Sequence, residues 1–204
     1  MLRGLWLVHP EQEMCEAFRT RFANLPNVRI IQGRFEDLEP HDCFVTAGNA
    51  FGMMTAGVDA AVVRFFGVEL MERIQHRILD EFLGEQPVGT AFIVSTGNAD
   101  YPFVAHAPTM RVPGNVDGTD KVYSATWAAL LAVHAHNQTH DRKIEVVALP
   151  AMGTGFGGMS FTEAARQMAV AYRHYLEPPC GLDWDFVAHR QKAICYEGDR
   201  QVAR

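Results

Sequence analysis

Cysteine is scarce in this sequence, and its spacing argues against two common ways of stabilising a small protein. The chain contains four cysteines that lie far apart and form no CxxC pair: Cys15, Cys43, Cys180 and Cys195. Structural zinc sites need such pairs, and disulfide frameworks need a denser set of cysteines. We therefore expect reduced, mostly buried thiols, no bound metal and no other cofactor.

Long apolar runs and an excess of positive charge are also missing. No apolar stretch approaches the roughly 20 residues of a membrane span, and Met1–Pro10 lacks the charged-then-apolar pattern of a secretion signal. The 18 Lys and Arg are outnumbered by 24 Asp and Glu, which gives a net charge of -6. Proteins that bind phosphate backbones are usually basic. We expect a soluble, cytoplasmic protein whose partner is neither a membrane nor a nucleic acid.

The composition that is present suits a globular α/β protein. Apolar residues make up 48% of the chain and charged residues 21%, without a shift that would divide it, so we expect one domain over 1–204. Short continuous apolar runs, typical of buried strands, alternate with runs of helical spacing. The expected strands are 4–8, 28–31, 43–47, 91–95, 103–107 and 144–149. Five helices are expected: one after Pro10, one that contains 62–66, one that ends near Leu83, one over about 120–136 and one over about 161–176.

The connections between these strands are too long for hairpins. Strands that alternate with helices in this way predict a three-layer α/β/α fold with a mixed, mostly parallel central sheet. Beyond Gly181 the pattern fits either a helix or a strand that contains Trp184, Phe186 and Ile194. The last residues, Gly198–Arg204, are expected to be frayed.

Two loops rich in small residues follow expected strands and lead into expected helices. One is 49–59, where Gly57 and Val58 stand at a helix start, and the other is 153–158, with four glycines in six residues. Ligands of open α/β sheets bind beyond the carboxyl ends of the strands, where free N–H groups at helix starts attract anions. Two such loops together predict a diphosphate site, although tight turns explain either loop alone equally well.

The second loop also matches GxGxxG, the dinucleotide-binding fingerprint, through Gly153, Gly155 and Gly158. That fingerprint needs an acidic residue at the end of a following strand about 20 positions on. Here Glu177 is followed directly by two prolines. A P-loop is excluded because no Gly-Lys-Ser/Thr follows the glycines. A Rossmann-type nucleotide-binding protein is therefore the least favoured alternative.

The order and spacing of these segments resemble the macrodomain family. In that family a strand ending Val-Asn-Ala-Ala-Asn precedes a loop ending Gly-Val-Asp at a helix start; here 45–49 reads Val-Thr-Ala-Gly-Asn and 57–59 reads Gly-Val-Asp. Segment 104–108, Val-Ala-His-Ala-Pro, is similar to the family's later strand. Segment 149–158, Leu-Pro-Ala-Met-Gly-Thr-Gly-Phe-Gly-Gly, is similar to its second loop. All four segments occur in the family's order.

The resemblance covers about 28–177, with 1–27 as an added N-terminal strand and helix and 181–204 as a C-terminal tail. It implies that the partner is ADP-ribose or an ADP-ribosylated macromolecule. It also implies a hydrolase that removes a group from the distal ribose, with Asn49 and Asp59 as catalytic residues. The ligand-binding residues implied are Ala47, Gly48, Gly57, Val58, Gly153, Thr154, Gly155, Phe156, Gly157 and Gly158. The alternative is a non-catalytic reader of ADP-ribose or a related nucleotide.

Physical reasoning adds an expectation for Asp59, and the sequence departs from the family at two positions. A carboxylate at a helix N-terminus is stabilised as the anion, so we expect Asp59 to orient a water rather than act as a strong base. Where the family has an adenine-binding aspartate after a glycine, this chain has Arg34; Glu36 or Asp37 would have to substitute. The first asparagine of the family motif is Thr46 here.

Four histidines are further candidates for functional residues. His134, His136 and His140 have helical spacing, but a polar helix end explains them better than a metal site that lacks a clear fourth ligand. His106 lies within an apolar strand and is expected to pack and hydrogen-bond in the core rather than catalyse.

The first loop also carries three large apolar side chains, Phe51, Met53 and Met54. They lie in a loop next to the predicted polar site. They would form either a lid over the ligand or a plug in the core, and the sequence favours neither.

Overall fold

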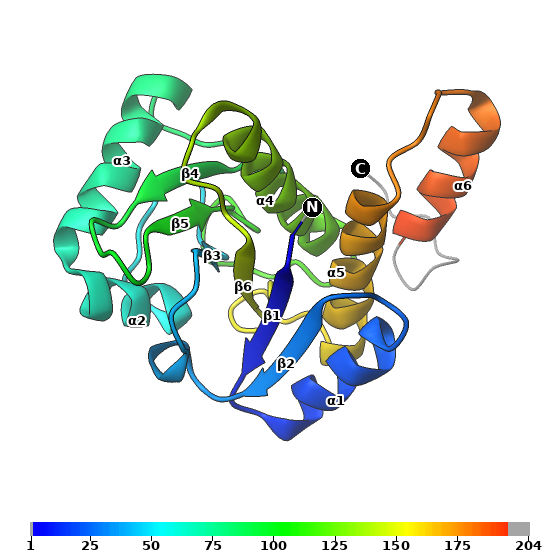
Figure 1. Cartoon of the computed structure of the whole chain (residues 1–204), viewed down its shortest axis with the longest axis horizontal. Coiled ribbons are helices and arrows are strands. Elements are labelled where there is room, and N and C mark those ends of the chain that lie inside the picture. The colour runs from blue at the N-terminus through cyan, green and yellow to red at the C-terminus, as the bar shows by residue number, and fades with distance from the viewer. Residues whose placement is uncertain (1, 196–204) are drawn as a thin grey trace.

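The computed structural model describes residues 2–195, and a single six-stranded sheet runs through this part of the chain (Figure 1). The strands are β1 (Gly4–His9), β2 (Val28–Gln32), β3 (Cys43–Thr46), β4 (Phe92–Ser95), β5 (Phe103–His106) and β6 (Val146–Pro150). Their order is β2-β1-β6-β3-β5-β4, and all neighbours are parallel except β4, which runs antiparallel to β5. The predicted mixed, mostly parallel sheet is confirmed.

Helices cover both faces of this sheet. One face carries α1 (Gln12–Phe22), α4 (Lys121–Thr139) and α5 (Phe161–Leu176), and the other carries α2 (Gly57–Phe66), α3 (Val68–Phe82) and the short 3-10 helix η1 (Phe35–Asp37). The last helix, α6 (Trp184–Ile194), lies outside α5 (Figure 1). Two separate apolar clusters fill the space between the sheet and each helical layer. The three-layer α/β/α fold is confirmed.

Local signals explain most of the element boundaries. The Ser160 side chain accepts a hydrogen bond from Glu163 N at 3.3 Å and so caps the start of α5. At the end of α3, Leu83 adopts the left-handed conformation (φ 54°) before Gly84 (φ 97°). The tail that the sequence left open is a helix, because Asp183 Oδ1 accepts a hydrogen bond from Phe186 N at 2.7 Å and caps α6. Residues 198–204, expected to be frayed, lie outside the described part.

Most boundaries match the sequence-based expectation to within one residue, and two differ by more. Strand β6 begins at Val146 rather than at Ile144, because Asp42 Oδ2 accepts hydrogen bonds from Glu145 N and Val146 N at 2.8 Å each. Helix α4 continues past His136 to Thr139. Among residues 2–195, no helix has the length and apolar character needed to cross a membrane.

Candidate functional site

A cavity of about 540 Å³ lies at one edge of the sheet. It is lined by segments that follow β1, β2, β3, β5 and β6, which are the five strands that run in the same direction. Their carboxyl ends meet at this edge, and Figure 1 shows β1, β2 and β6 running toward its lower side. Ligands of open α/β sheets bind in this place. The fold therefore places the cavity beside both predicted loops.

Most residues predicted for the site line this one cavity. Asn49 and Asp59 both line it. Nine of the ten predicted ligand-binding residues do so as well: Ala47, Gly48, Gly57, Val58, Gly153, Thr154, Gly155, Phe156 and Gly157. Gly158 is not among the lining residues; a side chain there would meet Asn115 Nδ2 at 3.3 Å.

The start of α2 presents free backbone donors to the cavity. Its N-cap residue, Ala56, makes no side-chain cap, and the first three helical residues, Gly57, Val58 and Asp59, line the cavity. Gly57 has a positive φ of 58°, which other residues rarely adopt. The first N–H groups of a helix have no partner within it and carry a partial positive charge. This helix start can therefore bind an anion.

The loop after β6 offers a second set of donors. Two of its N–H groups close its own turns: Gly158 N donates to Gly155 O at 3.0 Å, and Met159 N donates to Gly153 O at 3.2 Å. The N–H groups of 154–157 donate to no acceptor in the described part of the chain. A run of uncommitted backbone donors is a typical anion-binding arrangement.

Close packing explains only some glycines of this loop. A side chain at Gly157 would collide with the Gly153 carbonyl oxygen, and one at Gly153 would lie 2.6 Å from Val122 Cγ2. At Gly155, by contrast, no atom lies within 4 Å of the position a Cβ would take. The tight-turn explanation therefore accounts for Gly153 and Gly157, whereas Gly155 has open space beside it.

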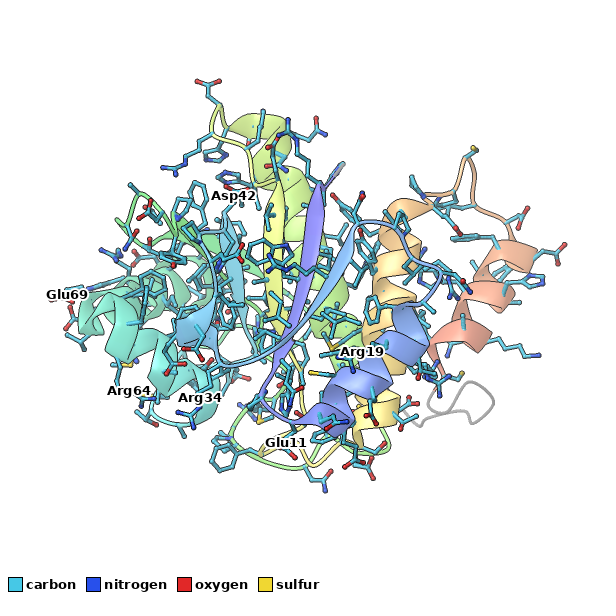
Figure 2. All side chains as sticks on the ribbon, turned by 60° about the horizontal axis from the view of Figure 1, so that its bottom comes forward. Glu11, Arg19, Arg34, Asp42, Arg64 and Glu69 are labelled. Carbon is cyan, nitrogen blue, oxygen red and sulfur yellow. The ribbon has the colours of Figure 1, made fainter. Side chains whose placement is uncertain are left out.

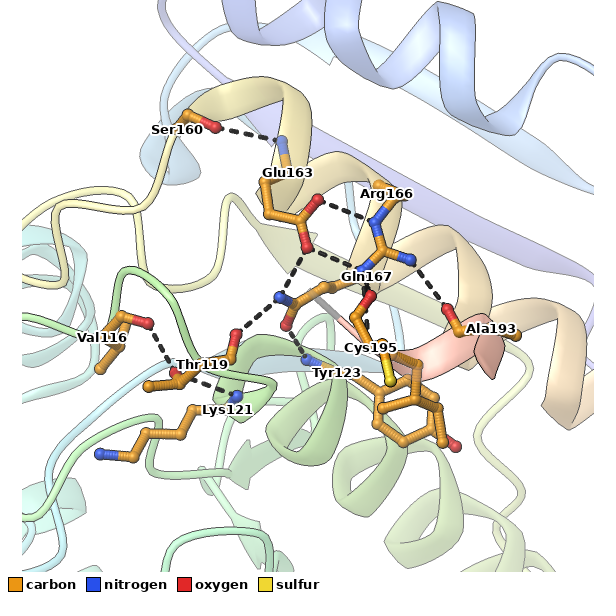
Figure 3. Close-up of polar contacts among 11 residues, drawn as sticks. Val116, Thr119, Lys121, Tyr123, Ser160, Glu163, Arg166, Gln167, Ala193 and Cys195 are labelled. Atoms are coloured by element: carbon orange, nitrogen blue, oxygen red, sulfur yellow. Dashed lines mark hydrogen bonds and ion pairs between the residues drawn. The ribbon is translucent and has the colours of Figure 1, made fainter. Parts of the chain in front are cut away.

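A buried polar network supports the glycine loop from behind (Figure 3). Val116 N donates to Gly157 O at 2.8 Å, and Val116 belongs to the segment that leads into α4. Gln167 of α5 holds this segment, because its Nε2 donates to Thr119 O at 2.8 Å and its Oε1 accepts from Tyr123 N at 2.9 Å. Gln167 Nε2 also donates to Glu163 at 2.9 Å. The position of the loop thus depends on α5.

The same network reaches the end of α6. Glu163 forms a largely buried ion pair with Arg166 at 2.7 Å. The Arg166 guanidinium also donates to the carbonyl oxygens of Ala193 and Cys195 at 2.8 Å and 2.7 Å, and so satisfies the last carbonyls of α6 (Figure 3). A buried ion pair that is broken on one side leaves an uncompensated charge. The helix that the sequence left ambiguous is therefore fixed to the body by this arginine.

The side chain of Asn49 is engaged within its own loop. Its Oδ1 accepts hydrogen bonds from Phe51 N and Met53 N at 3.1 Å and 3.3 Å, and its Nδ2 donates to Met53 O at 2.9 Å. One N–H of the amide remains for a ligand. Asn49 therefore shapes the first loop in addition to lining the cavity.

Asp59 differs from its expected state. It lies at the third position of α2 with 8% of its surface exposed, and its Oδ1 is buried without a hydrogen-bond partner among residues 2–195. Burial raises the pKa of this carboxyl to about 7. The expectation of a stabilised anion was wrong, because the cost of removing the charge from water exceeds the favourable effect of the helix start.

The large apolar residues of the first loop divide between the two predicted roles. Met54 is buried in the apolar cluster beneath α2 and α3, so it anchors the loop. Phe51 and Met53 line the cavity, and Met53 is 56% exposed. Phe156, in the opposite loop, is 65% exposed and also lines the cavity. Exposed apolar side chains thus flank the opening on two sides.

The opposite end of the cavity is open and charged. Arg34, Glu36 and Arg64 line it, and Figure 2 shows Arg34 and Arg64 near each other beside α2. Arg64 and Glu36 approach to 3.8 Å with both side chains well exposed. Of the two acidic residues considered as substitutes for the family's aspartate, Glu36 lines the cavity, while Asp37 accepts a hydrogen bond from Arg34 N at 3.4 Å.

Sequence reasoning missed the contribution of the segment after β1. His9 and Pro10 line the cavity. His9 Nδ1 accepts a hydrogen bond from Glu11 N at 3.2 Å, burial lowers its pKa, and the neutral ring therefore carries its proton on Nε2. The signal was available, because β1 was an expected parallel strand and its carboxyl end had to reach this edge.

The histidines at the end of α4 contact each other and the backbone. His136 and His140 stack at 4.2 Å between ring centroids, and His136 Nε2 faces Arg142 O at 2.9 Å. In the described ranges no cluster of three His, Cys, Asp or Glu residues has a geometry suited to a metal ion. The stacked pair fits the polar helix end that the sequence favoured.

The fold and the cavity are those of an open α/β protein, a class whose ligands bind beyond the carboxyl ends of the parallel strands. A family model described as Macro domain matches residues 45–168. An uncharacterized protein of Aquifex aeolicus is 32% identical over 155 residues, which is 76% of this chain and 85% of that protein. The chain belongs to the Macro domain family.

Solved structures are similar in fold. The Oceanobacillus iheyensis macrodomain with ADP has a TM-score of 0.58 at 21% identity, over 76% of this chain and 84% of that one. The Trypanosoma brucei macrodomain in complex with ADP-ribose has a TM-score of 0.51 at 19% identity, over 70% of this chain and 54% of that one. The family resemblance predicted from the sequence is confirmed.

Proposed function

We propose that this protein binds ADP-ribose and hydrolyses the bond between its distal ribose and an attached group. One observation carries the proposal: the first residues of α2 and residues 154–157, whose N–H groups have no acceptor in the described part of the chain, line the same cavity. Two sets of donors in one cavity suit a diphosphate. The cavity of about 540 Å³ falls within the usual range of small-molecule sites. The related macrodomains with ADP and ADP-ribose support the choice of ligand.

In this proposal the distal ribose lies against Ala47, Gly48 and Asn49, close to Asp59. A water oxygen forms a bond to the anomeric carbon while the bond from that carbon to the attached group breaks, and the bonding electron pair leaves with the group. Asp59 takes a proton from the water and returns it to the leaving group. With a pKa of about 7, this carboxyl accepts a proton more readily than an ordinary aspartate.

A second candidate is a reader that binds ADP-ribose without cleaving it. The observation in its favour is the Asn49 side chain, which is already engaged by Phe51 and Met53. Release of ADP-ribose from ADP-ribosylated proteins and nucleic acids, followed by mass spectrometry, separates the two candidates. Tight binding without release from any substrate would favour the reader.

Calorimetric titration with ADP-ribose tests the shared part of both candidates. Gly155 has open space beside it, so Gly155→Glu adds a carboxylate near the proposed diphosphate without a collision within the chain. We expect micromolar binding by the wild type and a loss of about 100-fold or more in this variant. Gly155→Gln has nearly the same size without the charge and should retain most of the affinity. Equal binding by all three proteins would contradict the proposed diphosphate site.

A further inference from the structure

Gly48 lies between two buried polar side chains. A methyl group at this position would be 2.7 Å from His106 Nε2 and 3.0 Å from Asp59 Oδ2. Asp59 comes from the start of α2 and His106 from the end of β5. Because Gly48 has no side chain, the carboxyl and the imidazole can both approach this position.

Neighbouring hydrogen bonds determine which nitrogen of His106 carries the proton. The Thr90 hydroxyl donates to Pro87 O at 2.7 Å, so toward Gln86 it acts as an acceptor, and Gln86 Nε2 donates to it at 3.2 Å. Gln86 Nε2 also donates to Thr90 O at 3.1 Å, which leaves Gln86 Oε1 as an acceptor for His106 Nδ1 at 2.6 Å. Nδ1 therefore carries the hydrogen, and Nε2 is an unprotonated acceptor.

Each of these two side chains has a buried polar atom without a partner in the described part of the chain. Asp59 Oδ1 and His106 Nε2 are buried and make no hydrogen bond within residues 2–195. Burial lowers the pKa of His106 to about 4, so its ring is neutral at pH 7. His106 is the titratable group that faces Asp59 from β5, whereas Arg64, further along α2, approaches Glu36. Unpartnered buried polar groups of this kind commonly share an internal water.

We propose that His106 is a positioning residue for Asp59: its Nε2 accepts a hydrogen bond from one buried water molecule, and this water also binds Asp59 Oδ1. The water is compatible with both states of the carboxyl. When Asp59 is neutral, its O–H donates to the water, and the water donates to Nε2. When Asp59 is ionised, the water donates one hydrogen to each side.

This arrangement lets Asp59 gain and lose a proton without rotating. His106 itself is fully buried and does not line the cavity, so it acts on a ligand only through Asp59. The consequence for catalysis rests on the proposed hydrolysis. The hydrogen-bonded pair does not, because it is formed by the ligand-free protein.

NMR of the ligand-free protein tests the pair directly. The ¹⁵N shift of His106 Nε2 near neutral pH should be that of an unprotonated nitrogen in a neutral ring, and the ¹³C signal of the Asp59 carboxyl should titrate near pH 7. In Gln86→Leu, Nδ1 loses its acceptor, so the proton moves to Nε2, which then donates toward the carboxylate. The Asp59 midpoint should fall by about one pH unit.

A second variant should move the same midpoint in the opposite direction. His106→Phe retains a ring of similar shape but offers no acceptor for the water, so Asp59 becomes less solvated and its midpoint should rise. A matched control is Gln75→Leu, which removes a hydrogen bond to Gly52 O at the same loop without touching the pair. That variant should leave the midpoint unchanged.

These measurements test the hydrogen-bonded pair of Asp59 and His106 independently of ligand binding. Opposite shifts in the two variants, together with a water between Asp59 and His106 in a high-resolution crystal structure, support the pair. A protonated His106 Nε2 in the wild type, a crystal structure without a water between the two side chains, or equal Asp59 midpoints in all variants would overturn it. Failure to bind ADP-ribose would contradict the proposed function and leave this pair in place.

Discussion

Charged and titratable groups are buried at one end of the cavity and exposed at the other. At one end Asp59 is 8% exposed and faces the fully buried His106 across Gly48. At the other end Arg34 is exposed, and the Glu36 and Arg64 side chains meet in solvent at 3.8 Å. Burial changes the proton affinity of the first pair, whereas solvent screens the second. We therefore expect the chemistry, and most of the sensitivity to mutation, at the buried end.

The largest effect is expected for Asp59→Asn on turnover. The amide has nearly the shape of the acid but cannot take a proton from water, so release of ADP-ribose should fall by about 100-fold or more. ADP-ribose affinity should change by no more than a few fold, because the diphosphate donors are unaltered. Single-turnover assays and calorimetry measure the two quantities. Unchanged turnover would remove Asp59 from the role we assign.

The same substitution should make the protein more stable at high pH. Burial raises the Asp59 pKa from 3.8 to about 7, so the folded state binds this proton more tightly than the unfolded chain. The stabilisation is fully present below about pH 4 and is lost as the pH rises toward 7. At pH 8, Asp59→Asn should therefore be more stable than the wild type by roughly 4 kcal/mol in urea unfolding.

That difference in stability should shrink toward pH 4. The His106 pKa is lowered from 6.5 to about 4, so its own contribution is lost as the pH falls through this range. Because both proteins contain His106, this loss largely cancels in the comparison. A stability difference that is independent of pH would mean that the Asp59 pKa is the same in the folded and the unfolded protein.

A smaller effect is expected for Gly48→Ala. The added methyl group would press against His106 Nε2 and Asp59 Oδ2, and relief of this contact should weaken ADP-ribose binding by about tenfold, or about 1.4 kcal/mol. Gly33→Ala is a matched control at the open end, since the nearest atom there is Ile31 Cγ2 at 3.9 Å. Calorimetry should show little change for that control. Equal losses in both variants would remove the distinction between the two ends.

The smallest effect is expected for Arg34→Ala. Its exposed charge is screened by solvent, so the affinity for ADP-ribose should change by less than about threefold, in line with the small contribution of surface charges. Titrations at low and high salt should agree closely. A tenfold loss would mean that the open end, too, recognises the ligand.

Local patterns in the sequence were sufficient to predict the architecture and the position of the cavity. Ser160 and the prolines after Glu177 bound α5, and the loops at 49–59 and 153–158 had to follow parallel strands. The contribution of β1 was overlooked, although its neighbours in the sheet, β2 and β6, bring His9 to the cavity. The expectation that residues 1–204 form one macrodomain stays a prediction.

The state of the site depended on tertiary contacts that no local pattern contains. Helix position alone predicted an ionised Asp59, but its burial beside Gly48 and His106 decides the pKa. The division of roles between Met54 and Met53 likewise depends on how the first loop packs against α3. Burial of a single side chain is determined by several distant segments, so it becomes visible only once the chain is folded.

The place of β6 in the sheet has a consequence for the order of synthesis. It lies between β1 and β3, and thereby joins the β2-β1 pair to the β3-β5-β4 group. Because a ribosome produces Val146–Pro150 after the other five described strands, the two groups of strands cannot be joined in one sheet before then. The glycine loop follows directly. Translation therefore completes the sheet and the proposed diphosphate site with one short segment, and a chain truncated before it has neither.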